Sequence, residues 1–408
     1  MIYVDPPFFT KAAYRSSLLL GRGLPALKMP AYEDRWTGGM DAYLAMLRDR
    51  LILMRELLAD DGLLWVHLDW HAVHYVKVML DQIFGPEHFI NEIIWQYKSG
   101  GSSKRHFARK HDTLLLYAKT KDYRLHVGKE KSYNRGRRPY RFRGVEEFCD
   151  EMGWYTMVNQ KDVWQIDMVG RTSAERTGYA TQKPLVLMRR IIESSTEEGD
   201  LCADFFCGSG SLPVAAAMMG RRFLACDRSS SALNITRKRL LEEGCGFVYR
   251  QQVPEASSSQ EDAAGDLPAQ VQTDGSTEQR CSVSGRACFQ VRRMPDGSIT
   301  VQLVDYVLSG GALSAGGTTA QIKVPSQLDA RRLIAYWSVD EADKAAVHRS
   351  CHVAFPSQGE KGMVMQIPAY DRCAGADRIS IMTVDLLGGT SRQILSVDGS
   401  SPDCTAAF

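Results

Sequence analysis

Apolar runs alternate with helical patterns over the first 97 residues. Tyr3-Val4 is a strand fragment, and residues 44–58 repeat Leu and Met at helical spacing. The run 62–69 is typical of a buried strand, and a helix is expected over about 71–84. This alternation predicts a parallel sheet covered by helices on both faces.

The same pattern returns over residues 181–245. A helix is expected from Pro184 to about Ser194, a strand over 201–204, a helix to Met219 and a second strand over 222–227. The chain therefore returns to α/β character after a segment of different character.

The C-terminal part has a different pattern. Residues 255–278 hold six acidic residues and no Lys or Arg, which predicts a flexible linker. Beyond it, residues 298–305, 333–339 and 379–384 alternate like half-buried strands. We expect a small β-rich domain over 281–396.

The formal charge of +2 conceals an uneven distribution. The hydrophobic and charged fractions of 44% and 24% are those of a globular protein and exclude a disordered or collagen-like chain. Residues 98–143, however, carry fifteen Lys and Arg against three acidic residues, a net +12 that leaves −10 elsewhere. Six Tyr and Phe are interleaved with these cations, and Tyr97 directly precedes them. Such a run of charges could be an ordinary solvated surface, but the excess of positive charge favours contact with nucleic acid.

Cysteine and histidine content indicates neither disulfide nor metal chemistry. Ten Cys are too few for a disulfide scaffold, and no Cys-x-x-Cys pair occurs. No run approaches the roughly 20 apolar residues of a membrane span, and no secretory signal opens the chain, so we expect a cytoplasmic protein without membrane contact. We predict no metal, because the grouped histidines lack ligand spacing: His67, His71, His74, His106 and His111.

The motif Asp5-Pro6-Pro7-Phe8 follows the first strand. Its two prolines favour an extended turn in which the Asp5 carboxylate and the Pro6 carbonyl face one point. Two acceptors beside an aromatic face suit an exocyclic amino group on a planar base. A turn with an Asp cap is the alternative.

A second motif, Asp204-Phe-Phe-Cys-Gly-Ser-Gly210, lies between a strand and a helix. Glycines there allow close approach of a ligand to the backbone and to the positive end of the helix. Asp227 ends the next strand, where it could bond ribose hydroxyls. This arrangement suits a dinucleotide or S-adenosylmethionine, although a tight strand-to-helix turn would look the same.

The order of three motifs resembles a known family. Asp5-Pro-Pro-Phe, Thr181-Gln-Lys-Pro-Leu and Phe206-Cys-Gly-Ser-Gly resemble the β-class amino-methyltransferases of DNA, which act on adenine N6 or cytosine N4. Alone, the Thr181 motif would be a capped helix start. With further matches, the chain is similar to modification subunits of type III restriction systems over about 1–250. Those matches lie at 35–51, 63–69, 80–85, 93–95 and 111–119.

The resemblance implies a fold and a division of the chain. The fold is α/β, with a Rossmann-like, S-adenosylmethionine-dependent methyltransferase sheet, helices on both faces, a basic insert and a small β-rich C-terminal domain. The implied parts are a catalytic half (1–97), a basic target-recognition region (98–180), a cofactor-binding half (181–250), an acidic flexible linker (251–280) and a β-rich accessory domain (281–408).

The resemblance also implies residue roles. The catalytic set is Asp5, Pro6, Pro7 and Phe8, with Asp5 and the Pro6 carbonyl accepting hydrogen bonds from the amino group and Phe8 stacking on a base rotated out of the duplex. Gly208, Ser209 and Gly210 would hold the methionine end of S-adenosylmethionine, and Asp227 its ribose. The remaining cofactor-pocket residues are Lys183, Asp204, Phe206 and Cys207.

Double-stranded DNA is the implied partner of the basic segment. The candidate DNA-contacting residues are Lys104, Arg105, Arg109, Lys110, Arg135, Arg137 and Arg138. The family also implies a homodimer and a restriction subunit as further partners. Adenine N6 is preferred to cytosine N4 because an Asp, rather than a Ser, opens the Pro-Pro motif.

Two departures from the family pattern keep alternatives open. Phe205 and Ser211 stand where the family usually has Pro and Thr, and family members carry residues upstream of the position of Asp5 that add a strand. A catalytically impaired DNA-binding or specificity subunit is therefore one alternative. A nucleotide-dependent oxidoreductase is another, but it leaves the Asp5 motif unexplained. No Pro-Cys dipeptide occurs, which argues against methylation at cytosine C5.

Overall fold

A computed structural model describes most of the chain and divides it into two units. The described residues are 1–18, 27–101, 104–250, 280–281, 284–309, 312–315, 318–321, 329–341, 352–356, 362–369, 371, 373–386 and 390–397. The first unit comprises Met1–Leu19 and Pro25–Arg239, and the second comprises Leu20–Leu24 and Leu240–Phe408. Nearly all of the predicted linker, at 251–279, lies outside the described residues.

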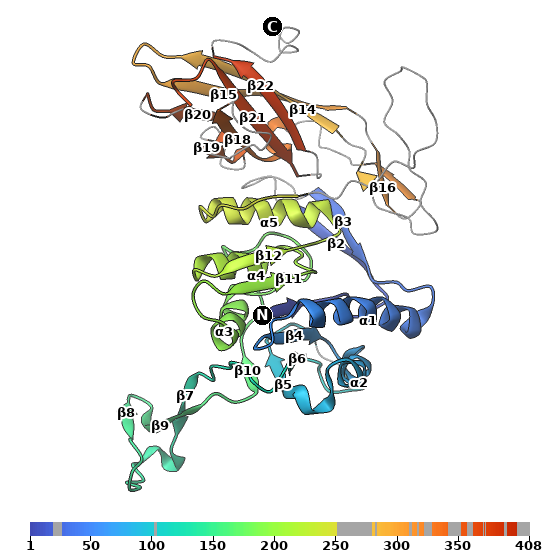
Figure 1. The fold of residues 1–408 in the computed structure, drawn as a ribbon, viewed down its shortest axis with the longest axis vertical. Helices are drawn as coiled ribbons and strands as arrows, with labels where there is room; N and C mark the ends of the chain where they lie inside the picture. Colours follow the sequence, from blue (N-terminus) through green and yellow to red (C-terminus); the bar gives the residue numbers. More distant parts are fainter. Residues whose placement is uncertain are drawn as a thin grey trace. The chain divides into compact units, whose positions relative to one another are not determined.

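A seven-stranded sheet forms the centre of the first unit (Figure 1). Its strand order is β10-β5-β6-β4-β1-β11-β12. The predicted strands over 62–69, 201–204 and 222–227 are β4, β11 and β12. In the order of the sheet, the strands are β10 (Val163–Gln165), β5 (Phe89–Gln96), β6 (His111–Ala118), β4 (Leu63–Leu68), β1 (Ile2–Val4), β11 (Leu201–Asp204) and β12 (Arg222–Ala225).

The sheet is mixed, so the expectation of a wholly parallel sheet was wrong. β1 pairs in parallel with β4 and β11, and β11 with β12, but β6 is antiparallel to both β4 and β5. The reason is the connection: β5 continues into β6 with no crossover helix, and a direct return reverses the strand direction. Residues 111–118 of the basic segment thus form a buried core strand.

Helices cover both faces of the sheet, as the sequence predicted. α1 (Gly39–Leu57) and α2 (Val73–Phe84) pack on one face with Ile2, Val4 and Leu64. On the other face, α3 (Leu185–Ser195) and α4 (Ser211–Met218) pack with Tyr3 and Trp65. Successive residues of β1 and β4 enter opposite cores, which is why these strands are apolar apart from His67.

The strand order reverses between β1 and β11. From β1 the chain proceeds through α1 to β4 on one side, and from β11 through α4 to β12 on the other. In α/β sheets, ligands bind outside the carboxyl ends of the strands at such a reversal. Asp5 and the Gly-rich turn after Asp204 both lie at these ends.

A hairpin brings a third segment to the same edge. β2 (Ala13–Leu18) and β3 (Leu27–Glu33) pair antiparallel. The Ser17 amide donates to the Gly178 carbonyl (2.8 Å), and the Ala180 amide to the Ser16 hydroxyl (3.2 Å). From the far side, the Ser211 hydroxyl of α4 donates to the Lys183 carbonyl (2.7 Å). These contacts fix the segment that contains Lys183.

An arm (residues 127–162) leaves the seven-stranded sheet and forms a small sheet of its own (Figure 1). Its central strand, β9 (Gly153–Asn159), pairs antiparallel with β7 (Lys129–Tyr133) and β8 (Phe148–Asp150). The connection from β7 to β8, residues 134–147, starts with a short 3-10 turn, η2 (Arg135–Arg137). A second such turn, η1 (Pro86–His88), precedes β5.

The C-terminal unit is β-rich, as expected, and the predicted strands over 298–305, 333–339 and 379–384 are β15, β18 and β21. α5 (Ser230–Glu242) crosses the boundary between the units. No helix in the described part of the chain is long and apolar enough to cross a membrane. The sheets are β19-β18-β21-β22, β14-β15-β20 and β13-β16-β17. Their strands are β13 (Arg280–Cys281), β14 (Ser284–Arg293), β15 (Ile299–Ser309), β16 (Ala312–Ala315), β17 (Thr318–Gln321), β18 (Ile334–Glu341), β19 (His352–Ala354), β20 (Val364–Ile367), β21 (Arg378–Asp385) and β22 (Thr390–Ser396), with a 3-10 turn, η3 (Ala330–Leu333).

Replacing Gly178 with Ala is expected to destabilise the first unit by about 1–3 kcal/mol. Gly178 has φ +83°, and a Cβ there would lie 1.9 Å from the Ser17 carbonyl oxygen. The matched control is Gly170→Ala, because Gly170 has no neighbour within 4 Å and its φ lies outside the left-handed range. Urea unfolding of the full chain measures both. Equal stability of the two variants would contradict the close packing of this segment on β2.

Candidate active site

The site lies at the carboxyl ends of β1 and β11. These parallel neighbours are paired in register, with Tyr3 opposite Asp204, so Asp5 and the turn after Asp204 leave the sheet side by side. About 200 residues of chain separate the two motifs. The sequence placed each motif at the end of a strand, and the pairing of those two strands brings them together.

The two carboxylate oxygens of Asp5 differ in their hydrogen bonding. Its Oδ2 accepts a hydrogen bond from Nζ of Lys183 at 2.6 Å, and both side chains are largely buried. Its Oδ1 is also buried, yet no described residue donates a hydrogen bond to it. A buried carboxylate oxygen without a donor carries a substantial desolvation cost. The geometry therefore leaves a place for a donor from a ligand.

His67 lies beside Asp5 and was missed as a site residue. Its Nδ1 is 2.8 Å from the Tyr3 hydroxyl and 3.8 Å from Oδ1 of Asp5, while Nε2 is 3.2 Å from Oδ2 of Asp112. The Tyr97 hydroxyl donates to the other oxygen of Asp112 (3.0 Å). A signal existed in the sequence, since His67 is the one polar residue in an otherwise apolar buried strand.

The network shifts the acidity of its members in opposite directions. Burial acts to raise the pKa of Asp112, but the hydrogen bonds from His67 and Tyr97 and the nearby charge of Lys183 outweigh it and lower that pKa. Burial, together with the charge of Asp112, raises the pKa of Tyr97. The network thus keeps an ionised carboxylate and a protonated phenol behind His67.

Phe8 provides a ring at the mouth of the same site. Its ring centroid is 5.5 Å from that of His67 and 5.2 Å from Nζ of Lys183. The ring also packs, partly buried, against the core of the α1 and α2 face. The four residues Asp5, Phe8, His67 and Lys183 therefore form one group, assembled from β1, β4 and the segment before α3. The prolines between Asp5 and Phe8 shape the turn, and Pro6 is buried.

The Gly-rich turn is tied to Asp227. The Gly208 amide donates to Oδ2 of Asp227 (2.8 Å), and the Ser229 amide donates to Oδ1 (2.8 Å). Gly208 and Gly210 have φ of +49° and +76°, and a Cβ on Gly210 would lie 2.6 Å from the Thr236 side chain. The turn therefore requires glycine at Gly210 for both conformation and space.

The other predicted pocket residues are mostly buried around this turn. Oδ1 of Asp204 accepts the Phe206 amide (3.0 Å), and the Cys207 amide donates to the Cys226 carbonyl (3.1 Å). Ser209 is buried and its carbonyl accepts from Arg239 (2.7 Å). Phe206 packs partly buried on the core. The structure thus gathers Asp204, Phe206, Cys207, Gly208, Ser209 and Gly210 in one turn.

The site gathers carboxyl groups whose protonated forms are favoured. Burial, reinforced by the charges of Asp5 and Asp227, raises the pKa of Asp204 well above its ordinary value. Burial also raises the pKa of Asp227, against the effect of its backbone hydrogen bonds. Three carboxyl groups therefore converge on the carboxyl ends of neighbouring strands, with the ammonium group of Lys183 among them. The cluster offers a ligand several hydrogen-bonding groups from different strands.

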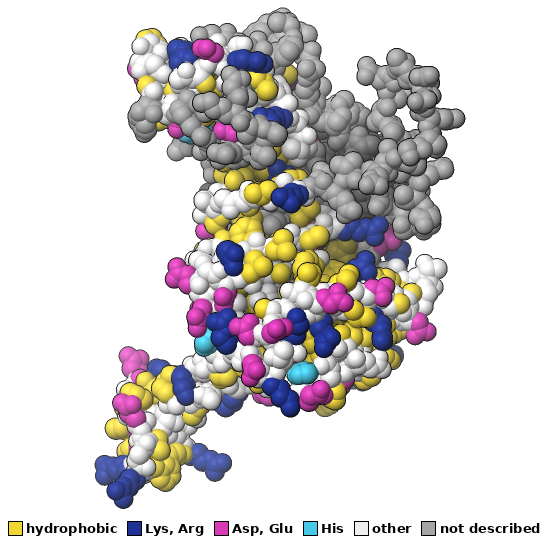
Figure 2. All heavy atoms as spheres, viewed as in Figure 1, with side chains coloured by type: hydrophobic (Ala, Val, Ile, Leu, Met, Phe, Trp, Pro, Cys, Tyr) yellow, Lys and Arg dark blue, Asp and Glu magenta, His cyan; other side chains and the backbone are white. Residues whose placement is uncertain are grey.

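The predicted DNA-contacting residues fall into two separate groups. Lys104, Arg105, Arg109 and Lys110 precede β6, where Arg109 stacks on the Trp70 ring (3.7 Å to the centroid) and Lys110 donates to the Ser99 and Gly100 carbonyls. The other three residues lie at the end of the arm, where Figure 2 shows Lys and Arg side chains gathered. They are Arg135, Arg137 and Arg138.

A single carboxylate organises the end of the arm. Glu147 accepts hydrogen bonds from the backbone amides of Tyr140 (2.8 Å) and Arg141 (2.7 Å) and from Nδ2 of Asn134 (2.6 Å). The two backbone hydrogen bonds lower the pKa of Glu147, so it remains ionised. The turn that presents the arginines is thus held from inside by one acceptor.

Comparison with known proteins identifies relatives of the first unit. A family model described as DNA methylase, of the N6 and N4 class, matches residues 1–238. The type II methyltransferase M.EcaI of Enterobacter cloacae is 30% identical over 299 residues, which covers 59% of this chain and 64% of that protein. M2.DpnII of Streptococcus pneumoniae is 29% identical over 247 residues, covering 60% of this chain and 82% of the relative.

Similar solved structures include an M1.HpyAVI complex with S-adenosylmethionine, at 18% identity and a TM-score of 0.37. It covers 59% of this chain and 87% of that one. The PvuII DNA methyltransferase, described as cytosine-N4-specific, has 14% identity and a TM-score of 0.40, with 60% and 80% of the two chains covered.

Replacing Asp204 with Asn is expected to change how stability depends on pH. Because folding raises the pKa of Asp204, its contribution to stability is complete below the unfolded-state pKa of about 3.9 and is lost as pH rises toward the folded-state pKa. The wild type should therefore lose stability relative to Asp204→Asn with rising pH, by at most about 1.4 kcal/mol per pH unit. Urea unfolding at a series of pH values measures the difference. The exposed Asp122→Asn serves as control, and a pH-independent difference for Asp204→Asn would refute the raised pKa.

Proposed function

The chain belongs to the DNA methylase family whose model matches residues 1–238, and we propose that it methylates an exocyclic amino group of a base in double-stranded DNA. The methyl donor of this reaction is S-adenosylmethionine. The observation that carries the proposal is the buried Oδ1 of Asp5, an acceptor without a donor that lies beside the Gly-rich turn at the reversal of the sheet.

The residues of the site fit S-adenosylmethionine. Asp5 and Asp227 offer carboxyl oxygens to its polar groups, and Gly208 and Gly210 add no side chain that would obstruct a ligand. The oxygens of Asp227 each accept one backbone amide and retain lone pairs for ribose hydroxyls. When bound, the cofactor supplies an electrophilic methyl group on sulfur.

Asp5 would orient and deprotonate the target amine. Its Oδ1 accepts one N–H of the amino group, which concentrates the nitrogen lone pair on the side facing the methyl group. Methylation of the nitrogen would leave one amine proton to be removed. Oδ1 of Asp5 is the acceptor placed for that proton, because Lys183 already occupies Oδ2. Positioning supplies most of the rate enhancement in such a site.

The target base would have to leave the duplex to reach Asp5, which is nearly buried. Phe8 offers its ring for stacking, backed by His67 and Lys183. Arg135, Arg137 and Arg138 at the end of the arm would contact DNA, and the group from Lys104 to Lys110 would contact phosphates nearer the core. Phe107, which is 99% exposed, lies within this second group.

Within this function, we propose N6 of adenine as the methyl acceptor, because the first residue of the Asp5-Pro6-Pro7-Phe8 motif is an Asp rather than a Ser. Cytosine N4 is the alternative that an Asp also permits. The catalytic half (1–97), recognition region (98–180) and cofactor half (181–250) remain a proposed division, with β6 of the second segment contributing to the core. The resemblance to type III modification subunits, the homodimer and the restriction subunit stay predictions.

Asp5→Ala is expected to lower methyl transfer at least about 100-fold, because it removes the acceptor that orients the amine. The assay measures incorporation of labelled methyl groups from S-adenosylmethionine into unmethylated double-stranded DNA. Digestion of the product to nucleosides then separates N6-methyladenine from N4-methylcytosine.

The controls for this experiment are Asp122→Ala, an exposed carboxylate far along the chain, and Asp5→Asn, which keeps the shape but not the charge. Asp122→Ala should behave as wild type. Transfer that persists in Asp5→Ala would exclude the proposed role. DNA binding by wild type without any transfer would favour a specificity subunit.

The triple substitution of Arg135, Arg137 and Arg138 by Ala is expected to weaken DNA binding and to flatten its salt dependence. Each lost phosphate contact reduces the slope of log K against log salt by about 0.9, so the slope should fall by about 2–3 units. Fluorescence anisotropy with a labelled duplex measures both quantities. The matched control replaces three exposed arginines of α1, Arg48, Arg50 and Arg55, and an equal effect of the two triples would argue against the arm.

A further inference from the structure

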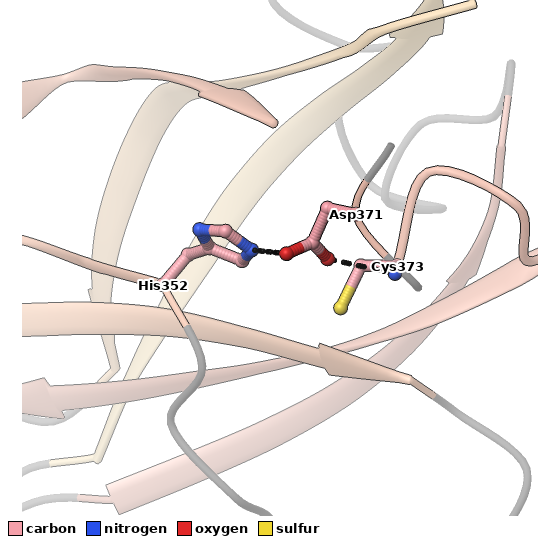
Figure 3. Close-up of side chains that lie close together, drawn as sticks. All are labelled: His352, Asp371 and Cys373. Carbon is pink, nitrogen blue, oxygen red and sulfur yellow. Dashed lines mark hydrogen bonds and ion pairs between the residues drawn. The ribbon is translucent and has the colours of Figure 1, made fainter. Parts of the chain in front are cut away.

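Three side chains of different chemistry converge in the C-terminal unit. His352 begins β19, which pairs with β18, whereas Asp371 and Cys373 lie in the connection between β20 and β21. Figure 3 shows the three side chains pointing toward one another. Their candidate donor atoms, an imidazole nitrogen, a carboxylate oxygen and a thiol sulfur, all lie within 4.8 Å of one another.

The three donors lie close enough to converge on one small cation after a small adjustment. Nε2 of His352 and Oδ2 of Asp371 are 3.1 Å apart, slightly less than the separation of about 3.3–3.6 Å between two donors of a tetrahedral ion at about 2.0–2.2 Å each. Cys373 is fully buried and Nε2 of His352 is buried as well, while the side chains of His352 and Asp371 are otherwise partly accessible. A cation held by these donors would therefore be largely shielded from solvent.

The connection between β20 and β21 holds its two donors in place. Oδ1 of Asp371 accepts the Cys373 backbone amide (2.9 Å), which directs Oδ2 toward His352. The Asp371 amide donates to the Pro368 carbonyl (2.9 Å). From β14, Arg293 donates to the carbonyls of Ala374 and Ala376. Hydrogen bonding of the ligating carboxylate and its loop is what orients ligands in metal sites.

The donor set selects the class of metal. Calcium and magnesium prefer oxygen ligands, whereas one nitrogen, one oxygen and one sulfur match a borderline-soft ion. Zinc is held by these three kinds of donor, and three protein ligands leave one coordination position for water or another donor. The Cys373 side chain hydrogen-bonds to Asp371 and His352 pairs with the same carboxylate, so a cation bound here would take the place of the protons in these contacts.

We propose that His352, Asp371 and Cys373 bind one Zn²⁺ ion. The Cys373 thiol loses its proton to solvent on binding, His352 binds through neutral Nε2, and Asp371 through Oδ2. The ion joins β19 to the β20–β21 connection, two parts of the C-terminal unit that are adjacent in space. Its role is structural, since a metal clip adds binding free energy to the folded state of a small β-rich unit.

The test uses Co²⁺ as a spectroscopic probe of the full-length, metal-free chain. Binding at this site produces a near-ultraviolet thiolate-to-cobalt charge-transfer band and visible bands of four-coordinate Co²⁺, which one equivalent of Zn²⁺ abolishes. Cys373→Ser should remove the charge-transfer band. His352→Gln should weaken Co²⁺ affinity by about 100-fold or more, since loss of an outer-shell partner alone costs 10–100-fold.

The matched control is Cys149→Ser, because Cys149 is an exposed thiol in the arm and should not affect the spectrum. Circular dichroism of Cys373→Ser checks that the chain remains folded. If it unfolds, His352→Gln and Zn²⁺ protection of the Cys373 thiol from alkylation decide the question. No charge-transfer band in the wild type, or a band unchanged by His352→Gln, overturns the proposal. The readout does not involve methyl transfer, so it is independent of the proposed function.

Discussion

The pairing of β1 with β11 is the interaction on which the rest of the first unit depends. β1 has only three residues, all buried, yet it joins β4 on one side of the sheet to β11 on the other. Its register sets Asp5 beside the Gly-rich turn, and every other contact of the site follows from that placement. A shift of one residue would exchange the faces to which Ile2, Tyr3 and Val4 point, so the two cores fix the register that the site requires.

Most polar groups of the site are fixed by hydrogen bonds, but one oxygen of Asp5 has no hydrogen-bond partner. Asp5 is held on one oxygen by Lys183, which is itself held through its own carbonyl by Ser211. Behind it, His67 connects Tyr3 to Asp112 through the strand next to β1. Each of these buried polar groups has a partner, and the second oxygen of Asp5 does not. Because buried polar atoms are usually paired, the unpaired Oδ1 of Asp5 stands out among these hydrogen-bonded neighbours.

The sequence predicted the elements well and the neighbours poorly. Strong periodicity located α1 to α4 and strands β4, β11, β12, β15, β18 and β21, and the motifs placed Asp5 and Gly208 at strand ends. It could not predict the antiparallel β6, because direction depends on the connection and not on the residues of the strand. The sequence marked His67 as a lone polar residue in an apolar strand, but its role arises from the lateral neighbours Tyr3 and Asp112. Nor could the sequence identify the His352, Asp371 and Cys373 group, which only the folding of three strands assembles. Pairing between neighbouring strands joins residues that are far apart in the chain, and the pattern of a single sequence does not indicate which strands will pair.

The construction of the arm also bears on how such a protein could diversify. Its three strands pair with one another and not with the seven-stranded sheet, and the end of the arm is folded around its own Glu147. Substitutions in residues 134–147 therefore leave the two cores and the Asp5 group undisturbed. Under the DNA-contacting role proposed for the arm, lineages that share the first unit could acquire new sequence preferences by changing this short connection alone, with little loss of stability to select against each step.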